Sequence, residues 1–412
     1  MLFSLAVFGS QAFFVDCCLR FRNLMTEPDS IRLPLIAVTA FGLEAVVSRE
    51  LKTLGFAETR VEDGRVHFEA DFAGLARTNL WLRSADRVQL VIGRFEAFDF
   101  GELFDRTREL PWEQWLGRFA KFPVRGRSVR SQLHSVPDCQ RIVKKAIVER
   151  LKDCYEVDWL EETGNEYAID VAVIRNEVTL TIDTTGEALN RRGYRKLTAK
   201  APLRETLAAA LVQLSVWHPD RPFVDPFCGS GTLPIEAAMI ARNLAPGRNR
   251  EFAASQWPQI PKAIWDEAKA EAHDLAKPKP DEMLIGTDID GEVLSLARYH
   301  ARQAGVDDCV HFQQKPFADL TSSRSYGCVV TNPPYGERLS EAEVAPIYSS
   351  MPGVFGQLDT WSFFVLTSIP NFERTIRRKA TRRRKLFNGK IECTYYQMLG
   401  PKPPRMQRDS QA

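Results

Sequence analysis

Cysteine is scarce in this chain: there are eight in 412 residues, and no two have the spacing Cys-x-x-Cys. This excludes a disulfide framework, argues against structural zinc or any other metal site, and fits the reducing cytoplasm. An excess of charge of one sign is also missing, because the net charge is only +2. The protein is therefore not a polycation, and any affinity for nucleic acid must come from local basic patches.

Long hydrophobic runs are absent beyond residue 19, so no later segment is long enough to cross a bilayer. Residues 1–19 are apolar enough to resemble a signal peptide, but they lack a basic start and are interrupted by Asp16. We expect residues 1–30 to be a disordered leader or a start-site extension, since Met25 begins a plausible soluble N-terminus. The whole chain is 44% hydrophobic and 26% charged, the balance of a soluble enzyme with two or three domains.

The first folded unit is expected over residues 31–100. Its pattern predicts strands at 35–38, 66–68 and 88–94, helices at 42–54 and 72–83, and a hairpin turn at Asp63-Gly64. The resulting β-α-β-β-α-β order is that of a ferredoxin-like domain.

A second unit is expected over residues 101–186. It has a predicted strand at 119–124, a helix at 137–151, and two alternating strands that turn at Arg175-Asn176. Basic side chains flank this strand and helix, among them Arg125, Arg127, Arg130, Lys144 and Lys145. They form either a solvated charged face or a surface that contacts nucleic-acid phosphates.

Residues 186–200 are predicted to be a linker, after which the chain changes character. From 187 to 405, apolar strands ending at 224, 288, 314, 331 and 367 alternate with helices such as 233–243 and 291–304. That alternation predicts a doubly wound, Rossmann-like parallel sheet. An Asn388-Gly389 turn marks a final hairpin, and residues 406–412 form a tail.

The first of three motifs in this region lies between a strand end and a helix, at Asp225-Pro226-Phe227-Cys228-Gly229-Ser230-Gly231-Thr232. Gly229 and Gly231 allow close approach of the backbone to a ligand. Pro234 stands where a dinucleotide-binding loop has its third glycine, which argues against NAD. The acidic Asp225 suits a ligand with an ammonium group, such as S-adenosylmethionine.

The second motif, Gly286-Thr287-Asp288-Ile289-Asp290, ends the next strand. Asp288 is predicted to accept hydrogen bonds from ribose hydroxyls, and Asp290 to cap the helix that follows.

The third motif, Asn332-Pro333-Pro334-Tyr335, follows another strand and so lies at the same edge of the sheet. An amino nitrogen conjugated to a ring is a poor nucleophile. The Asn332 side-chain oxygen and a backbone carbonyl can accept hydrogen bonds from the two N–H groups of this nitrogen and bias it toward tetrahedral geometry. Tyr335 can stack on the base. The alternative is a plain Asn-Pro turn, but the order of the three motifs favours a methyltransferase.

Residues 374–385 are a basic run in which eight of twelve side chains are Lys or Arg. Such a run is either a solvated surface or an RNA backbone contact, and we predict the contact, centred on Arg382, Arg383 and Arg384.

These motifs resemble those of the class I S-adenosylmethionine-dependent RNA guanine-N2 methyltransferases that carry a THUMP domain. The resemblance covers residues 189–405 and rests on APLRETL, DPFCGSGTLPIEAA, GTDID, TNPPYGERL and KLFNGKIECTYYQMLGPKPP. Residues 119–184 resemble a THUMP RNA-binding domain, preceded by its ferredoxin-like companion. The pattern is most similar to bacterial stand-alone relatives of the N-terminal half of the 23S rRNA m2G methyltransferase, without the second methyltransferase half.

The resemblance implies roles for single residues. Asp225, Gly229, Gly231 and Thr232 would line the methionine end of the cofactor, and Ser230 would also bind the cofactor. Ala201, Pro202 and Leu203 would lie against it from the linker side. Asp288 would hold the ribose, and Asn332, Pro333, Pro334 and Tyr335 would hold a target guanine. The residue that contacts the adenine is left unassigned.

The expected function is therefore methylation of guanosine N2 in RNA, with 23S rRNA as substrate and a role in rRNA processing. The alternatives are a tRNA guanosine-N2 methyltransferase and a non-catalytic RNA-binding assembly factor. DNA adenine and protein glutamine methyltransferases share the third motif, but the upstream THUMP-like unit and the basic patches favour RNA.

Overall fold

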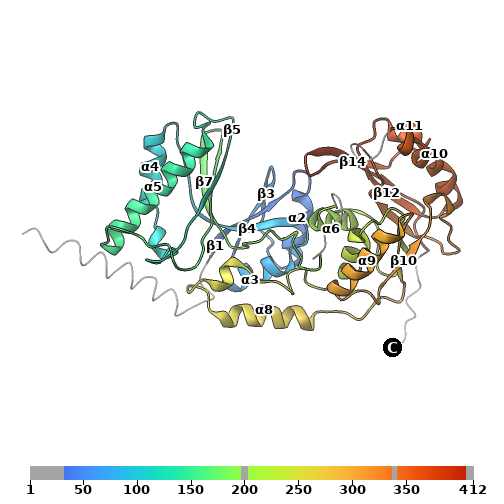
Figure 1. Cartoon of the computed structure of the whole chain (residues 1–412), viewed down its shortest axis with the longest axis horizontal. Coiled ribbons are helices and arrows are strands. Elements are labelled where there is room, and N and C mark those ends of the chain that lie inside the picture. Colours follow the sequence, from blue (N-terminus) through green and yellow to red (C-terminus); the bar gives the residue numbers. More distant parts are fainter. Residues whose placement is uncertain (1–31, 196–202, 336–340, 405–412) are drawn as a thin grey trace, which may run out of the picture.

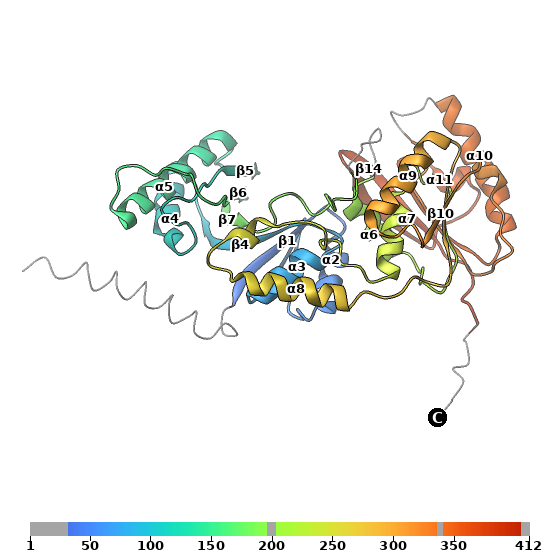
Figure 2. The ribbon, with the colours of Figure 1, turned by 60° about the horizontal axis from the view of Figure 1, so that its bottom comes forward.

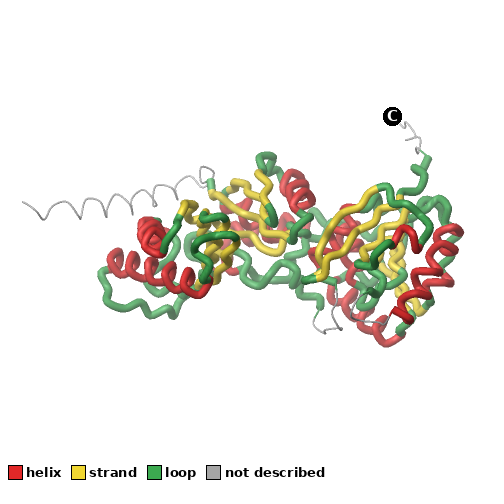
Figure 3. Tube along the Cα trace, turned by 90° about the horizontal axis from the view of Figure 1, so that it is seen from above, coloured by secondary structure: helices red, strands yellow, loops and turns green. Residues whose placement is uncertain are grey.

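The computed structural model describes residues 32–195, 203–335 and 341–404 and contains two seven-stranded sheets (Figure 1). Seen from above, the sheets lie one after the other along the long axis of the molecule (Figure 3). The predictions for the leader, the C-terminal tail, Ala201 and Pro202 fall outside the described residues. Within the described residues, no helix is long and apolar enough to span a membrane, and no cluster of acidic, His or Cys side chains could hold a metal.

The N-terminal unit has the predicted β-α-β-β-α-β order. Its elements are β1 (Leu33–Thr39), α2 (Glu44–Thr53), β2 (Arg60–Glu62), β3 (Arg65–Ala70), α3 (Phe72–Trp81) and β4 (Ala85–Glu96). The hairpin between β2 and β3 turns at Asp63-Gly64, where Gly64 has a φ of +70°. Asp71 caps α3 by accepting a hydrogen bond from the Gly74 amide.

The second unit continues the first sheet. Its elements are α4 (Phe100–Glu109), a 3₁₀ turn at Trp112–Gln114, β5 (Val124–Val129), α5 (Val136–Tyr155), β6 (Ile169–Ile174) and β7 (Glu177–Asp183). β4 pairs with β7, which gives the strand order β2-β3-β1-β4-β7-β6-β5. The two units therefore share one sheet, with the helices of both on the same apolar face.

The strand predicted at residues 119–124 is wrong, because β5 begins where that strand was expected to end. Before it, Lys121 forms only an isolated bridge with Glu166. Pro123 has no N–H to donate to a ladder, so regular pairing with β6 starts one residue later.

The C-terminal unit contains the second sheet. Its elements are α6 (Glu205–Leu214), β8 (Phe223–Asp225), α7 (Thr232–Ala241), a 3₁₀ turn at Ala253–Gln256, α8 (Lys262–Asp274), β9 (Leu284–Asp288), α9 (Gly291–Ala304), β10 (Val310–Gln314), a 3₁₀ turn at Phe317–Asp319, β11 (Cys328–Thr331), α10 (Glu341–Gln357), β12 (Ser362–Thr367), α11 (Phe372–Thr375), β13 (Arg382–Asn388) and β14 (Ile391–Met398). The order β10-β9-β8-β11-β12-β14-β13 is parallel up to β12 and antiparallel beyond it.

The two halves are joined more tightly than a linker at residues 186–200 would imply. Residues 245–274, including α8, return to the first unit, and α8 lies beside α3 (Figure 2). The described part of the linker is buried at Arg192 and Tyr194, which both face the fully buried Glu236 of α7. Arg192 also donates to the Arg83 carbonyl, so a buried charged cluster fixes the junction.

Candidate active site

Three of the parallel strands, β8, β9 and β11, end at the same edge of the second sheet, and each is followed by one of the predicted motifs. Adjacent parallel strands share their carboxyl edge, so side chains far apart in sequence meet there. The structure thus joins two pairs of residues from different strand ends by hydrogen bonds, Gly229 with Asp288 and Thr331 with Asp225.

The glycine loop after β8 depends on backbone conformations that favour glycine. Gly229 has a φ of +50° and Gly231 a φ of +84°. A Cβ added to Gly231 would lie 2.9 Å from the ring of Phe312, whereas one added to Gly229 would meet no atom within 4 Å. Gly231 is therefore required for packing, and Gly229 faces open space large enough for part of a ligand.

Asp225 is a buried carboxylate, with only 1% of the residue exposed. Its Oδ1 accepts a hydrogen bond of 2.6 Å from the Thr331 hydroxyl and one of 3.2 Å from the Phe227 amide. Burial, with a smaller contribution from nearby Asp288, raises the pKa of Asp225 to about 7, although the two donors oppose the rise. No basic side chain of the described residues contributes to this pKa, so the site fits the ammonium group of a ligand.

Asp288 accepts a 2.9 Å hydrogen bond from the Gly229 amide, which ties the glycine loop to the end of β9. Its other oxygen accepts from the Asp290 amide at 3.1 Å. Asp290 in turn caps α9, because its side chain accepts from the amides of Glu292 and Val293. The predicted cap by Asp290 is confirmed by this geometry, and the ribose-binding role of Asp288 stays a prediction.

The motif Asn332-Pro333-Pro334-Tyr335, called the tetrad below, contains an acceptor without a donor among the residues that the structure describes. This acceptor is the buried Asn332 Oδ1 atom, which makes no hydrogen bond to any of them. The Pro334 carbonyl accepts from the Tyr348 hydroxyl at 3.1 Å, so it is already engaged. A buried acceptor without a donor is costly, and a donor on a bound substrate would satisfy it.

Tyr335 is only 6% exposed and packs in the core of the C-terminal unit. Its hydroxyl accepts from the Asn388 side chain at 3.0 Å and contacts the Cys393 thiol. This ring therefore anchors the β13–β14 hairpin to the tetrad, and its predicted stacking on a base stays a prediction.

The other predicted cofactor residues surround the start of α7. Leu203 is buried in the same core, and Thr232 accepts a hydrogen bond from Arg195, which also forms an ion pair with Glu205 at 3.3 Å. The Ser230 carbonyl contacts the buried His300. Arg195 lies in the segment that the sequence indicated only as a linker.

The basic residues of the second unit do not form the single surface that was expected. Gly126 of β5 faces α5, because a Cβ there would contact Val136 and Gln140. Side chains alternate along a strand, so Arg125 and Arg127 point to the opposite, open face. The exposed Arg130 follows this strand.

Lys144 and Lys145 belong to α5 and so lie on the helical side of the sheet. Lys144 pairs with Glu162 at 2.6 Å and donates to the Phe122 carbonyl at 3.0 Å, so its charge is engaged within the second unit, and its role as an RNA contact stays a prediction. Lys145 is exposed and lies 3.7 Å from Glu149.

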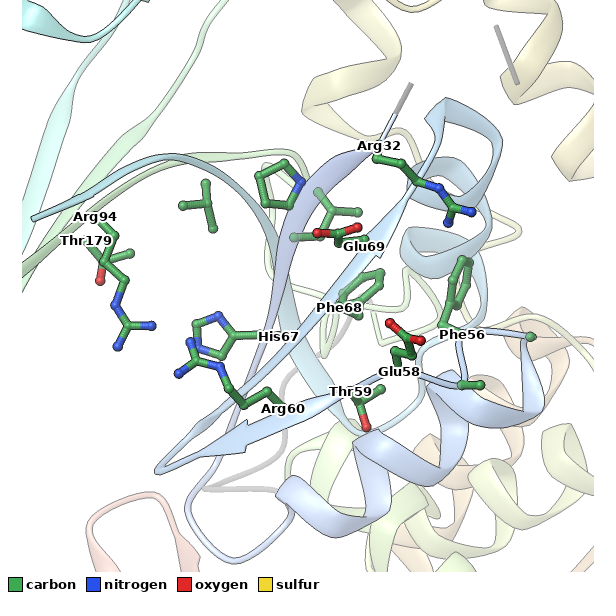
Figure 4. A pocket seen from close by; sticks show the side chains of 15 residues that line it. Arg32, Phe56, Glu58, Thr59, Arg60, His67, Phe68, Glu69, Arg94 and Thr179 are labelled. Atoms are coloured by element: carbon green, nitrogen blue, oxygen red, sulfur yellow. The ribbon is translucent and has the colours of Figure 1, made fainter. Parts of the chain in front are cut away.

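A hollow of about 960 Å³ opens on the N-terminal unit, between β1, β3, β4 and the loop before β2 (Figure 4). Arg60, His67 and Arg94 lie along one side of it. Glu62 pairs with all three and Glu177 also pairs with Arg94, so the charges of the two arginines are balanced by two carboxylates and do not favour an anion there.

Three arginines of the C-terminal basic run, Arg382, Arg383 and Arg384, belong to β13 at the edge of the second sheet. Arg383 is paired with Glu373 at 2.5 Å. Arg382 and Arg384 alternate with it and lie on the other face of the strand. These three arginines are therefore divided between two faces of one strand.

Two residues of this site were not singled out from the sequence. Thr331 reads as an ordinary buried strand residue, and only the fold places its hydroxyl against Asp225. Ile289 follows Asp288 and is 67% exposed, although it is a large apolar residue at the ligand edge. The sequence could have indicated Ile289, because its apolar side chain directly follows the predicted ribose-binding aspartate.

Comparison with known proteins agrees with this architecture. Residues 34–89 match the RlmL ferredoxin-like domain, 97–183 the THUMP domain, and 192–397 the RMKL-like methyltransferase domain. A Bacillus subtilis (strain 168) protein named "Putative RNA methyltransferase YpsC" is 46% identical over 381 residues, which are 92% of this chain and 99% of that protein. This chain belongs to the RMKL-like methyltransferase family.

Solved structures of the family have the same fold. One from Listeria monocytogenes, described as a predicted N6-adenine-specific DNA methylase, is 49% identical with a TM-score of 0.87 and covers 92% of this chain and 99% of its own. Another, SMU.472 in complex with SAH, is 42% identical with a TM-score of 0.86 and covers 90% of this chain and 99% of its own. The resemblance stated from the motifs, the fold class and the methyltransferase assignment are thereby confirmed.

Proposed function

We propose that this methyltransferase uses S-adenosylmethionine to methylate the exocyclic N2 of a guanosine in RNA, with 23S rRNA as the substrate. The observation that carries this proposal is the buried Asn332 Oδ1, an acceptor without a donor at the carboxyl edge of the sheet. The THUMP match supports RNA as the polymer, and the SAH complex of SMU.472 supports the cofactor.

The cofactor site is assigned from the geometry of the ligand edge. Asp225 would bind the ammonium group of the cofactor, the Gly229–Thr232 loop would surround its methionine end, and Asp288 would accept from its ribose hydroxyls. Ile289, exposed beside Asp288, would pack against the adenine. When bound, this cofactor supplies a methyl group on a sulfonium sulfur, which a nitrogen nucleophile can take.

The tetrad would prepare the nitrogen. Asn332 Oδ1 would accept a hydrogen bond from one N–H of the amino group. The Pro333 carbonyl would accept from the second N–H, because the Pro334 carbonyl already accepts from the Tyr348 hydroxyl. Both bonds strengthen as the nitrogen gains positive charge, so they stabilise the transition state more than the bound substrate. The two prolines hold these acceptors in place before the substrate binds.

On the RNA side, Arg125, Arg127 and Arg130 would contact phosphates from the open face of the first sheet. Arg382 and Arg384 would do so from β13, and the exposed Lys145 belongs to a separate face. Neutralising Arg125 and Arg127 together would then weaken RNA binding less at high salt than at low salt.

Guanine N2 and adenine N6 are both exocyclic amino groups, so the tetrad alone does not separate them. The test is to delete the gene and to quantify N2-methylguanosine and N6-methyladenosine by mass spectrometry in separated 23S rRNA, tRNA and DNA. Loss of N2-methylguanosine from 23S rRNA alone is expected. Its loss from tRNA would favour the tRNA alternative, and loss of N6-methyladenosine would refute the guanine assignment.

The non-catalytic alternative is tested with Asn332→Ala. We expect methyl transfer to purified RNA from the deletion strain to fall by at least a hundredfold, while calorimetric affinity for S-adenosylmethionine stays within about twofold. A protein that neither binds the cofactor nor transfers methyl groups would instead be an RNA-binding assembly factor.

A further inference from the structure

The β13–β14 hairpin projects past the end of the parallel strands at the ligand edge. Thr367 ends β12 and pairs with Thr394 of β14, so Ile391 to Cys393 and the turn before them extend beyond it. The Asn388 side chain of this turn donates to the Tyr335 hydroxyl of the tetrad at 3.0 Å. The tip of the hairpin therefore stands beside the site where the target base would lie.

A loop of the N-terminal unit meets the hairpin at this place. Gly42 packs against β13 so closely that a Cβ would lie 2.7 Å from the Lys385 carbonyl oxygen. Glu44 fixes the loop by accepting from the amides of Gly42 and Gly64, each at 2.9 Å. The loop is thus held rigidly against the hairpin by backbone contacts.

The contact carries two aromatic rings, one from each half of the molecule. Phe41 of the loop and Phe387 of β13 lie edge to face, with ring centroids 6.1 Å apart and an angle of 70° between the rings. Phe41 is nevertheless 49% exposed, and Phe387 is only partly buried. Rings that served only to join the two halves would be expected inside the contact rather than at its surface.

One cation of β13 lies beside the pair. Lys385 lies 5.7 Å from the Phe387 ring centroid and also pairs with Glu392 at 2.7 Å, whereas Arg384 alternates with it and points to the other face of the strand. Exposed rings with a cation beside them are a combination with which proteins hold unpaired nucleotides, because every base has a face that can stack and every nucleotide carries a phosphate.

We propose that Phe41 and Phe387 form a stacking platform for an unpaired RNA nucleotide next to the target base, with Lys385 beside its phosphate. The platform deepens the proposed function and rests on it, because it assigns a substrate contact to an RNA methyltransferase. It is assembled only when the N-terminal unit and the methyltransferase unit are docked, so it would link RNA binding by the first half to the catalytic edge of the second.

The test uses full-length Phe41→Leu, Phe387→Leu and the double variant, because leucine retains apolar packing but removes the stacking face. Binding to a fluorescein-labelled twelve-nucleotide oligouridylate and transfer to RNA purified from the deletion strain are measured. We expect the double variant to bind the oligonucleotide about tenfold more weakly and to show a raised KM for RNA. Affinity for S-adenosylmethionine and the thermal midpoint should match the unsubstituted protein.

Two further variants distinguish stacking from packing. Phe387→Trp enlarges the stacking face and should bind the oligonucleotide at least as tightly as the unsubstituted protein. Trp159→Leu removes a 76% exposed ring on the second unit and serves as the matched control, with no effect on the KM for RNA.

RNA affinity unchanged in the double variant would overturn the platform and leave an interdomain contact. An equal loss with Trp159→Leu would also overturn it, because the effect would then not be specific to the pair. If the unsubstituted protein neither binds nor methylates RNA, the proposed function itself fails, and the platform fails with it.

Discussion

Cofactor binding should depend on pH because Asp225 is buried, and the hydrogen bond from Thr331 should set the midpoint of that dependence. One substitution should therefore shift the midpoint. Asp225 would bind an ammonium group only as a carboxylate. Burial raises its pKa to about 7, so a decreasing fraction is ionised below that pH. We expect affinity for S-adenosylmethionine to fall by up to tenfold for each pH unit below about 7 and to level off above it.

Thr331→Val removes the hydroxyl that donates to Asp225 Oδ1 at 2.6 Å. A hydrogen bond to a charged group contributes about 1.5–3 kcal/mol, and about 1.4 kcal/mol corresponds to one pH unit. The midpoint of the binding curve should therefore move upward by about one to two pH units. At pH 7 that would weaken cofactor binding by roughly five- to fiftyfold, whereas at pH 9.5 the two proteins should bind almost equally.

The groups that influence the pKa of Asp225, apart from Thr331, are its own buried surroundings, the Phe227 amide and Asp288 of β9. Calorimetric titration with S-adenosylmethionine between pH 6 and 9.5 measures the curve. Thr331→Ser retains the donor and should restore the original midpoint. An equal loss of affinity at every pH in Thr331→Val would refute the reasoning, because it would mean that Thr331 acts only through packing.

Four other substitutions test separate parts of the structure. Gly229→Ala should lower the thermal midpoint by only a few degrees yet block cofactor binding, whereas Gly231→Ala should unfold at clearly lower temperature because its Cβ would clash with Phe312. The raised pKa of Asp225 means that the folded protein binds the proton of this carboxyl more tightly than the unfolded chain does. The free energy of unfolding should therefore fall as pH rises from about 4 to about 7. Asp225→Asn should remove this dependence of stability on pH and unfold at higher temperature at pH 7.5, with cofactor affinity lost. Glu236→Ala leaves Arg192 buried without its ion pair and should cost about 3–5 kcal/mol, measured by urea unfolding, whereas the exposed Glu161→Ala should change little.

The sequence by itself determined the catalytic edge of this protein. Each of the three motifs directly follows an apolar strand, and the carboxyl ends of neighbouring parallel strands must meet at one edge. Residue spacing was therefore enough to place Asp225, Asp288 and Asn332 together. The β-α-β-β-α-β order and the Asn388-Gly389 hairpin were also predictable, because helix and strand periods and turn residues act over a few neighbouring positions.

Only the tertiary structure decided which distant surfaces meet. β4 pairs with β7, which follows it by some eighty residues, and that pairing merges two predicted domains into one sheet. The packing of α5 against one face of β5 separates Arg127 from Lys144, because alternation along β5 directs Arg127 to the open face whereas Lys144 belongs to the helix on the opposite face. The contact of Phe41 with Phe387 and the bond from Thr331 to Asp225 likewise join distant segments. Local patterns do not encode such contacts, because they depend on how complete elements pack against one another.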